Sequence, residues 1–488
     1  MKAGTAACAL LLAALAGSAG AFSPVWDTVV RLTTDSANQV TGYGGQHGIA
    51  VDAGGNVHVA WLEQRTVPYQ VWYRRYDAGT RTWLAETVLT DRPANCFRPG
   101  IACDSAGNVH LTWHMENWQC CGIWFKRYDV ALQRWKADTL IDSTTTSLTQ
   151  LHPSVACVPG SGDVEVAWYG LPDTGMYYRV FLKERHQATG WDSAAQVSSA
   201  SVNHDQVSVA AGANRDIAAV WCGMDFGGSY NQVCCRRRIS GAWQDVELVS
   251  DLPGGLTQNL PCVAIDRSSV VHVVWYGMSG SSFYQQVFHR SRGASGWSAI
   301  SSVGGIRAYQ QQFPSIACDA AGRCHAVWCS QAGGTHWQLA YAQRDTNGTW
   351  SSPMILTGLD SGNVSYPSVT CDADSGIHVV WYDNSSGNQD VYYLHGVAPG
   401  SGVSESRPSP FAPRPSPGAT IVRNRLDILQ STFCNLKSAI VLRDASGRRI
   451  MALHPGRNDI RGLPAGLYFI IRESATIPVR PSTVVIVK

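Results

Sequence analysis

The stretch that decides the fold is Pro314-Ser315-Ile316-Ala317-Cys318-Asp319-Ala320-Ala321-Gly322-Arg323-Cys324-His325-Ala326-Val327-Trp328. It consists of an extended run, a tight turn, and a second apolar run that ends at a tryptophan. Two short runs joined by such a turn are typical of a β-hairpin. A third run at 338–342 and a polar turn that leads to Trp350 follow. The unit therefore predicts four short β-strands.

This unit recurs along the chain. One series of tryptophans ends an apolar run every 52 to 55 residues, namely Trp61, Trp113, Trp168, Trp221, Trp275, Trp328 and Trp381. A second series opens the last strand of each unit, namely Trp26, Trp83, Trp135, Trp191, Trp243, Trp297 and Trp350. Four-stranded units with this period are typical of propeller blades. The sequence predicts an all-β, seven-bladed β-propeller over residues 22–397.

The way the ring closes follows from the second tryptophan series. The seventh unit runs through Trp381 and the segment 391–393 but lacks a fourth strand. The segment from Trp26 to Leu32 has the form of that missing strand and precedes the first blade. We therefore expect the N-terminal strand to complete the last blade, which leaves no blade with an open edge.

The N-terminal residues and the charge balance restrict the function classes. Residues 1–21 are typical of a secretory signal peptide, with Lys2, an apolar run at 6–16, and the small-residue site Ala19-Gly20-Ala21. That run is too short to cross a bilayer, and we expect no transmembrane segment. With 38 Lys and Arg against 36 Asp and Glu, the net charge of +2 gives no footprint for nucleic acid. We expect a monomer without cofactor or metal.

The blades resemble those of the sialidase-like propellers with BNR or Asp-box repeats. The likeness lies in the Asp-x-x-Gly-x-Val-His-x-x-Trp strand pair and the Gly-x-Trp step, and it covers residues 26–396. It implies a propeller and glycan-related activity. Sialidases proper have six blades, an arginine triad and an early Arg-Ile-Pro segment, where this chain has Arg31-Leu32-Thr33. This difference favours a binding protein over an enzyme.

The C-terminal part has a different composition. Residues 398–420 are rich in Pro and Ser, which predicts a semi-rigid linker. Residues 421–488 predict a small Ig-like β-sandwich that resembles the sorting domain of the bacterial type IX secretion system. The matching residues are 424–428, 444–449, 462–468 and the terminal Val-Ile-Val-Lys. The resemblance implies the type IX machinery as a partner, and secretion or display on the outer surface of a Gram-negative bacterium via the periplasm.

Alignment of the blades places one residue of each at the mouth of the central channel, namely Gln46, Arg98, His152, Gln206, Leu260, Phe313 and Tyr366. Nearby polar residues and two tryptophans outside the two series, Trp118 and Trp337, complete a rim suited to a glycan or cell-surface polymer. The ligand-binding candidates are Arg98, Trp118, His152, His204, Gln206, Gln311, Trp337 and Tyr366. The same amides could instead satisfy loop backbone groups.

Three readings of the function remain open at this point. The first is a secreted propeller that binds a glycan or surface partner, and the second is a purely structural surface protein. The third is a carbohydrate-active enzyme, either a sialidase-like hydrolase or a polysaccharide lyase. Hydrolysis needs two acids, with the candidates Glu63, Glu116, Asp173, Asp205, Asp225 and Asp383. A lyase would use His152 or Tyr366 as base and Arg98 to neutralise a uronate.

Other recurrent residues have structural interpretations. Five histidines lie three residues before a tryptophan of the first series and so form one repeated position. They are His58, His110, His272, His325 and His378. The glutamines that begin the third strand, Gln70, Gln232, Gln286 and Gln338, favour a repeated hydrogen bond. Disulfides are feasible between Cys96 and Cys120 or Cys121, between Cys222 and Cys234 or Cys235, and between Cys318 and Cys324.

Overall fold

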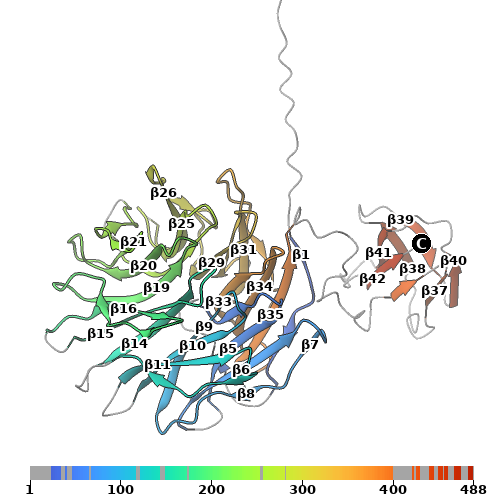
Figure 1. Ribbon diagram of the computed structural model, residues 1–488. Helices are drawn as coiled ribbons and strands as arrows, with labels where there is room; N and C mark the ends of the chain where they lie inside the picture. Colours follow the sequence, from blue (N-terminus) through green and yellow to red (C-terminus); the bar gives the residue numbers. More distant parts are fainter. Residues whose placement is uncertain are drawn as a thin grey trace, which may run out of the picture. The chain divides into compact units, whose positions relative to one another are not determined.

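A computed structural model describes residues 24–34, 39–40, 47–64, 67–116, 121–142, 149–172, 175–252, 256–280 and 282–398, and the backbone of seven strands between 420 and 486. Every regular element among these residues is a β-strand. The chain divides into two compact units at residues 410 and 411. The N-terminal unit is a ring of seven sheets (Figure 1), so the seven-bladed propeller is confirmed.

Each blade has three main strands, of seven to nine residues except for the three-residue β4 in blade 1. The first strands of the seven blades are β4 (Ile49–Val51), β9 (Asn95–Cys103), β14 (Gln150–Cys157), β19 (His204–Ala211), β24 (Gln258–Ile265), β29 (Gln311–Cys318) and β33 (Val364–Cys371). The second strands are β5 (Val57–Glu63), β10 (Val109–Glu116), β15 (Val164–Gly170), β20 (Ile217–Gly223), β25 (Val271–Gly277), β30 (Cys324–Ser330) and β34 (Gly376–Asp383). The third strands are β6 (Gln70–Asp77), β11 (Cys121–Asp129), β16 (Arg179–His186), β21 (Gln232–Ile239), β26 (Gln286–Gly293), β31 (Gln338–Arg344) and β35 (Asp390–Val397).

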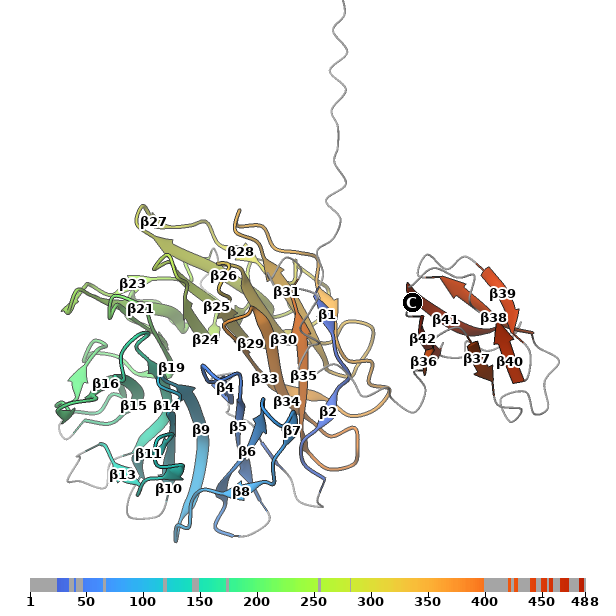
Figure 2. The same cartoon turned by 45° about the vertical axis from the view of Figure 1, so that its right-hand side comes forward.

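The outer edge of a blade consists of very short strands that pair with the third strand. In order they are β7 (Thr82–Trp83) and β8 (Thr87–Val88), β12 (Arg134–Trp135) and β13 (Thr139–Leu140), β17 (Gly190–Trp191) and β18 (Ala195–Gln196), β22 (Ala242–Trp243) and β23 (Glu247–Leu248), β27 (Gly296–Trp297) and β28 (Ser301–Ser302), and β32 (Met354–Ile355). Blade 1 also contains β3 (Gln39–Val40), which pairs with β5. Figure 2 shows the first strands nearest the centre of the ring.

The N-terminal segment closes the ring as the sequence predicted. Strand β1 (Val25–Trp26) pairs with β35 so that Trp26 lies opposite Gly396, and β2 (Val30–Arg31) pairs with the same strand so that Arg31 lies opposite Tyr392. The ring of Trp26 contacts Tyr341 of blade 6 edge to face at 4.9 Å. The first and last segments of the propeller are therefore joined by a β-ladder. The aromatic contact holds the N-terminal strand against blade 6.

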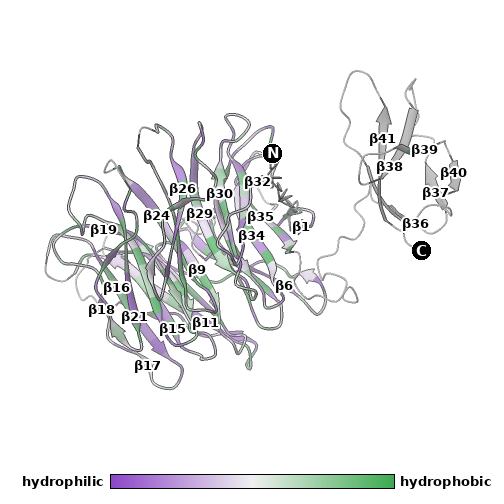
Figure 3. Ribbon diagram, turned by 90° about the horizontal axis from the view of Figure 1, so that it is seen from above, coloured by the Kyte–Doolittle hydropathy of each residue, from purple (hydrophilic) through white to green (hydrophobic). Residues whose placement is uncertain are grey.

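The core lies between the blades. All seven tryptophans at the ends of the second strands are buried. Clusters of buried apolar residues join adjacent blades, and Figure 3 shows that hydrophobic residues are frequent along the strands. Several indoles donate their N–H to a side chain at the end of the same sheet: Trp221 to Asp225, Trp381 to Asp383 and Trp168 to Gln150. Asp225 and Asp383, two of the acid candidates, therefore have structural roles.

The recurrent histidines confirm the structural interpretation of their position. His58 lies between Asp52, at 3.2 Å, and the hydroxyl of Tyr73, at 2.6 Å. The same Asp–His pairing recurs in blades 2, 5, 6 and 7. Because the Asp also accepts backbone N–H groups of the turn, each pairing holds the first hairpin of its blade together.

The recurrent glutamines also have structural roles. Gln70, Gln286 and Gln338 hydrogen-bond backbone groups of the segment that follows their blade's outer strand. This confirms the repeated hydrogen bond for three of the four glutamines, whereas the Oε1 of Gln232 is buried without a hydrogen-bond partner among the described residues.

The described part of the C-terminal unit contains seven strands. One sheet has the order β36 (Thr420–Val422), β42 (Ser482–Ile486), β41 (Gly466–Glu473), β38 (Ala439–Asp444), β39 (Arg449–Leu453), and a second pairs β37 (Arg425–Ile428) with β40 (Gly456–Asp459). The described residues of this unit are thus all in β-strands, whereas the Ig-like sandwich and the sorting role remain predictions. The predicted signal peptide and most of the linker lie outside the described residues. In the described part of the chain, no helix has the length and hydropathy needed to span a membrane.

Candidate functional site

A repeated β-bulge lies in the first strand of six blades, near the start of that strand. This part of a blade is called its inner end below. In blades 2 to 7 the register between the first and second strands shifts at the bulge. One non-glycine residue there has a positive φ of 45 to 55°, namely Arg98, His152, Gln206, Leu260, Phe313 or Tyr366. A bulge re-aims a side chain and costs local strain. Since the feature recurs in six blades, the strain belongs to the architecture, and the differences between blades lie in the side chains.

In blade 1 the described part of this segment begins at His47, which has a positive φ of 52°. The sequence placed the neighbouring Gln46 at the mouth of the channel. Gln46 itself lies outside the described residues. Burial lowers the pKa of His47 to about 4, so this imidazole is neutral at physiological pH.

Blades 2 and 3 bring a cation, two imidazoles and a phenol together. The Nη1 of Arg98 donates to Nδ1 of His152 at 2.6 Å. The ring of His114 lies 5.5 Å from that of His152. The hydroxyl of Tyr169 lies 3.5 Å from Nε2 of His152, and its ring contacts the imidazole edge to face at 4.9 Å. These four residues are called the polar cluster below.

Electrostatics sets the charge of this cluster. Burial, followed by the nearby charges of Arg98 and His114, strongly lowers the pKa of His152. Because Nδ1 of this neutral ring accepts from Arg98, its proton is on Nε2 and points to the oxygen of Tyr169. Burial also raises the pKa of Tyr169, which stays a phenol. The cluster therefore presents one fixed positive charge beside two uncharged proton carriers.

Two carboxylates flank the polar cluster and differ in character. Burial raises the pKa of Asp205 to about 6, although His204 and Arg98 oppose the shift. Its Oδ1 atom is buried without a hydrogen-bond partner among the described residues. Glu116 is half exposed and lies 3.3 Å from Nε2 of His114, and this hydrogen bond lowers its pKa. Environments that push two carboxyl pKa values apart are typical of catalytic and binding sites.

Blades 5 to 7 present a different surface at the same level of the ring. Phe313 lies 4.4 Å from Tyr366 and 5.5 Å from Tyr276, measured between ring centroids. Tyr366 lies 5.8 Å from Tyr382. These four rings form a continuous aromatic row, called the aromatic row below. The inner end of the propeller thus has a charged, hydrogen-bonding part and an aromatic part.

Some of the predicted site residues have other roles. Both ring nitrogens of His204 are engaged, with Asp225 at 3.0 Å and with the Tyr178 carbonyl at 2.9 Å. Gln206 accepts from the backbone N–H of Leu260 at 2.6 Å and so joins blade 4 to blade 5. Gln311 is buried and donates to Gln286 at 2.7 Å.

The aromatic candidates separate in the same way. Trp337 packs partly buried against the blade 7 core. Tyr366 belongs to the aromatic row, and the tyrosine that contacts His152 is Tyr169. Trp118 and Asp173 lie outside the described residues.

Tyr169 was missed by the sequence reasoning, although a signal for it existed. It directly follows Trp168, a tryptophan of the first series. The residue at this position varies between blades: Leu62, His114, Tyr169, Cys222, Tyr276, Cys329 and Tyr382. Side chains alternate across a strand, so this position faces away from the buried indole. Variation at one position of a conserved repeat is typical of residues that serve a specific surface.

The predicted disulfide of Cys222 is wrong. Cys222 lies opposite Val233 in the ladder, and its thiol contacts Oε1 of Gln206 at 3.2 Å and the Gln258 carbonyl at 3.5 Å. Cys234 and Cys235 are separate buried thiols. Cys96 is a buried thiol, and the side chains of Cys120 and Cys121 lie outside the described residues. The sulfurs of Cys318 and Cys324 do meet, at 3.0 Å.

Comparison with known proteins shows the fold alone. No family model matches the chain, and no curated protein does. Among solved structures, the polysaccharide lyase Uly1 superimposes with a TM-score of 0.52 at 10% identity, over 76% of this chain and 99% of that one. A PL25 ulvan lyase bound to -[GlcA(1-4)Rha3S]- gives 0.52 at 10% identity, over 75% and 95%. The Hadza microbial sialidase Hz136 gives 0.41 at 11% identity, over 78% and 95%.

Proposed function

We propose that this protein binds an acidic polysaccharide at the inner end of the propeller, with Arg98 pairing with a sugar carboxylate. The observation that carries the proposal is the contact of Arg98 with a neutral His152. A guanidinium matches a carboxylate in a two-point geometry, and a neutral imidazole orients it without cancelling its charge. The secreted or surface location that the sequence predicts is consistent with a polymer ligand.

The aromatic row supplies the second half of the binding site in this proposal. Aromatic faces offer apolar contact area, which suits the C–H face of a pyranose. Phe313 and Tyr276 are only partly buried, so they are accessible within the row. The saccharide in the ulvan lyase structure contains GlcA, a uronic acid, which is the chemical class that the polar cluster favours.

A panel of matched polymers tests this proposal. The full chain should bind a polyuronate and should bind a neutral polymer of similar linkage much more weakly. Arg98→Gln should reduce the affinity for the polyuronate about 10- to 100-fold, the range of a lost charged hydrogen bond. Arg134→Gln, which changes an exposed residue at the outer edge, is the matched control. Equal binding of both polymers, or equal loss in both variants, would contradict the proposal.

A second candidate function is a polysaccharide lyase, favoured by the contact of Tyr169 with His152. In β-elimination a base removes the proton next to the carboxylate, the bond to the leaving oxygen breaks, and a C=C bond forms. Arg98 would turn to the carboxylate and release Nδ1 of His152 as the base, and neutralisation of the guanidinium by the ligand would raise the lowered pKa of His152 toward the range that a base needs. Tyr169, protonated because burial raises its pKa, would give its proton to the leaving oxygen.

Product analysis separates binding from lysis. A lyase releases an unsaturated uronate that absorbs in the ultraviolet, whereas a hydrolase releases reducing ends without this absorbance. Tyr169→Phe should abolish the absorbance and keep the affinity for the polymer. Binding without either product would leave the first function and exclude the second.

A further inference from the structure

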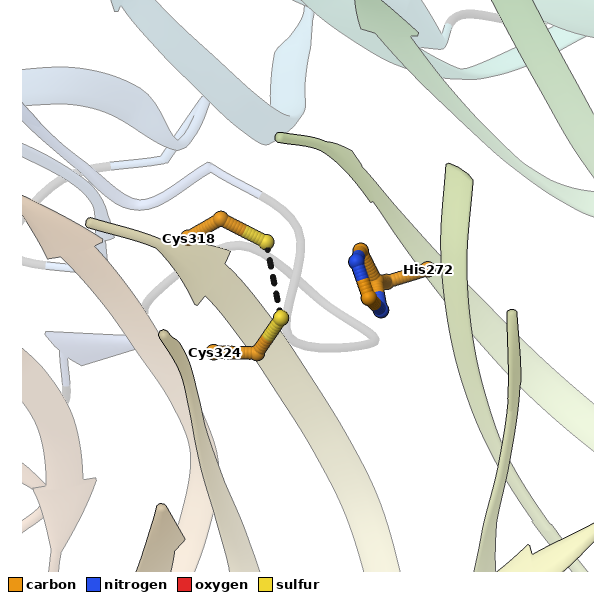
Figure 4. Close-up of side chains that lie close together, drawn as sticks. All are labelled: His272, Cys318 and Cys324. Carbon is orange, nitrogen blue, oxygen red and sulfur yellow. Dashed lines mark hydrogen bonds between the residues drawn. The ribbon is translucent and has the colours of Figure 1, made fainter. Parts of the chain in front are cut away.

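Blades 5 and 6 bring two thiols and an imidazole together at a point away from the polar cluster (Figure 4). The sulfurs of Cys318 and Cys324 lie 3.0 Å apart. One ligand atom from each of these residues and from His272 lies within 4.8 Å of the others. We propose that His272, Cys318 and Cys324 bind a thiophilic cation of the Zn²⁺ class. Nothing in the proposed polysaccharide binding depends on this site.

The donor set and its geometry fit such an ion. Thiolate sulfur and imidazole nitrogen are the donors that Zn²⁺ prefers. With Zn–S bonds of about 2.3 Å in a tetrahedral site, two sulfurs lie about 3.8 Å apart. Cys318 and Cys324 would therefore separate by less than about 1 Å. His272 and Cys324 are buried, which excludes competing water.

Blade 6 alone has a thiol on both strands of this hairpin. Blades 2, 3 and 7 also carry a cysteine at the first position, as Cys103, Cys157 and Cys371. At the position of Cys324 the other blades carry Val57, Val109, Val164, Ile217, Val271 and Ile377. Since Cys318 and Cys324 are direct partners in the ladder, the exchange of one apolar residue for cysteine creates the two-thiol arrangement.

Blade 5 orients the imidazole toward the sulfurs. In blades 1, 6 and 7 the Nδ1 of the repeated histidine meets a tyrosine hydroxyl. In blade 5 the partner is Nε2 of His289, at 3.1 Å from Nδ1 of His272. A proton on Nδ1 that is donated to His289 leaves a lone pair on Nε2 of His272. This hydrogen bond from the second nitrogen is the usual support of a metal-binding histidine.

Asp266 stands beside that lone pair. Its Oδ2 atom lies 3.4 Å from Nε2 of His272, compared with 3.0 Å for the equivalent pair of Asp104 and His110. About 3.4 Å is also the separation of two light ligand atoms on a tetrahedral Zn²⁺ with bonds of about 2.1 Å. The Asp266 carboxylate is not among the ligand atoms that lie within 4.8 Å of one another, so it would become a fourth ligand only by moving toward the sulfurs.

A disulfide between Cys318 and Cys324 is the competing state, because it bonds the same two sulfurs to each other and gives His272 no part in holding them. The two states exclude each other, since a cation needs both thiolates. Metal binding also releases the thiol protons into solution, whereas a preformed disulfide has none to release.

Co²⁺ titration of the reduced, chelator-treated full chain tests the proposal. We expect one equivalent to bind with a thiolate-to-metal charge-transfer band and the visible bands of a tetrahedral site, and Zn²⁺ to displace it. Cys324→Val introduces the residue that other blades carry and should abolish the charge-transfer band. Cys371→Ala, at the position of Cys318 in blade 7, is the matched control. His289→Phe, which copies Phe125 of blade 2, should weaken binding about 10- to 100-fold.

Three results would overturn the proposal. The first is the absence of the charge-transfer band in the reduced wild-type protein. The second is unchanged Co²⁺ binding in Cys324→Val. The third is a disulfide between Cys318 and Cys324 in the isolated protein, found by peptide mapping, whose reduction restores no cation binding.

Discussion

Arg98 and His152 come from neighbouring blades, and the Nη1 of the arginine lies 2.6 Å from Nδ1 of the histidine. Both residues occupy the same bulge position of the repeat, with φ values of 51 and 52°. Two equivalent positions of the repeat thus carry different side chains, and the guanidinium of one donates a hydrogen bond to the uncharged imidazole of the other. The proposed function rests on this pair, and the first prediction concerns its electrostatics.

Arg98→Gln should raise the pKa of His152. Burial is the main reason why this pKa is low, and the positive charge of Arg98 adds to the effect. Removal of the charge leaves the burial, so the pKa should rise but stay below its ordinary value. NMR titration of the imidazole checks this outcome. An unchanged His152 titration, with the fold intact, would show that the two groups are not coupled.

Asp205→Asn should change the pH dependence of stability. Burial raises the pKa of Asp205 to about 6, above the ordinary 3.8. The folded protein therefore keeps this proton in a range where the unfolded chain releases it. The carboxyl lowers the free energy of unfolding progressively as pH rises from about 4 to 6, and the penalty remains at higher pH.

Asn cannot ionise. The free energy of unfolding of Asp205→Asn, relative to that of the wild type, should therefore be higher at pH 7 than at pH 4. The expected difference is about 1–3 kcal/mol, discounted because the side chain is partly exposed. Urea unfolding at both pH values measures it, with Asp374→Asn at an exposed turn as control. A difference that is equal at the two pH values would contradict the raised pKa.

Arg238→Met should destabilise the fold by about 3–5 kcal/mol, because it leaves a buried carboxylate without its partner. Glu165 is fully buried and accepts from Nη2 of Arg238 at 2.5 Å. It stands where other blades have the repeated histidine. Burial raises the pKa of Glu165 to about 7, and Arg238 opposes this shift.

The double variant Arg238→Met/Glu165→Met separates charge from shape. Arg238 also lies 2.9 Å from Oε2 of Glu184, which keeps Arg215 as a partner at 2.5 Å. Since the double variant removes the Arg238–Glu165 pair and leaves Glu184 with Arg215, it should recover most of the lost stability in thermal or urea unfolding. A double variant as unstable as the single one would show that packing, and not the uncompensated charge, is responsible.

Trp26→Ala should lower the free energy of unfolding by about 2–4 kcal/mol, since it removes a partly buried indole from the closure of the ring. Val25→Ala changes a residue that is 73% exposed in the same strand and should have little effect. Urea denaturation compares the two. If both variants unfolded like wild type, the N-terminal strand would contribute nothing to the propeller.

The architecture was predictable from the sequence because it is repeated. The tryptophans of the second strands are buried at one position seven times, so a single rule applied to every blade. The closure followed from the same spacing, and the pairing of Trp26 with Gly396 confirms it. In blade 1 the described residue with a positive φ is His47, and the aligned Gln46 lies outside the described residues.

The site was only partly predictable. Arg98 and His152 were found because they share the bulge position, and the structure brings them together. Tyr169 was not found, because its contact with His152 arises between strands whose spacing is not encoded in the repeat. Cys222 was misassigned because neither predicted partner lies opposite it: Cys234 lies opposite Trp221, on the other face of the sheet, and Cys235 lies opposite Val220, two residues along the strand. Its ladder partner is Val233, not a cysteine.

The most direct test of the account compares one polyuronate with the same polymer after chemical reduction of its carboxyl groups. The affinity of both for the wild-type chain and for Arg98→Gln is measured by calorimetry at two salt concentrations. The account predicts that reduction of the polymer and Arg98→Gln each weaken binding about 10- to 100-fold, and that together they add little more. Full additivity of the two losses, or no loss on reduction of the polymer, would contradict the pairing of Arg98 with a sugar carboxylate.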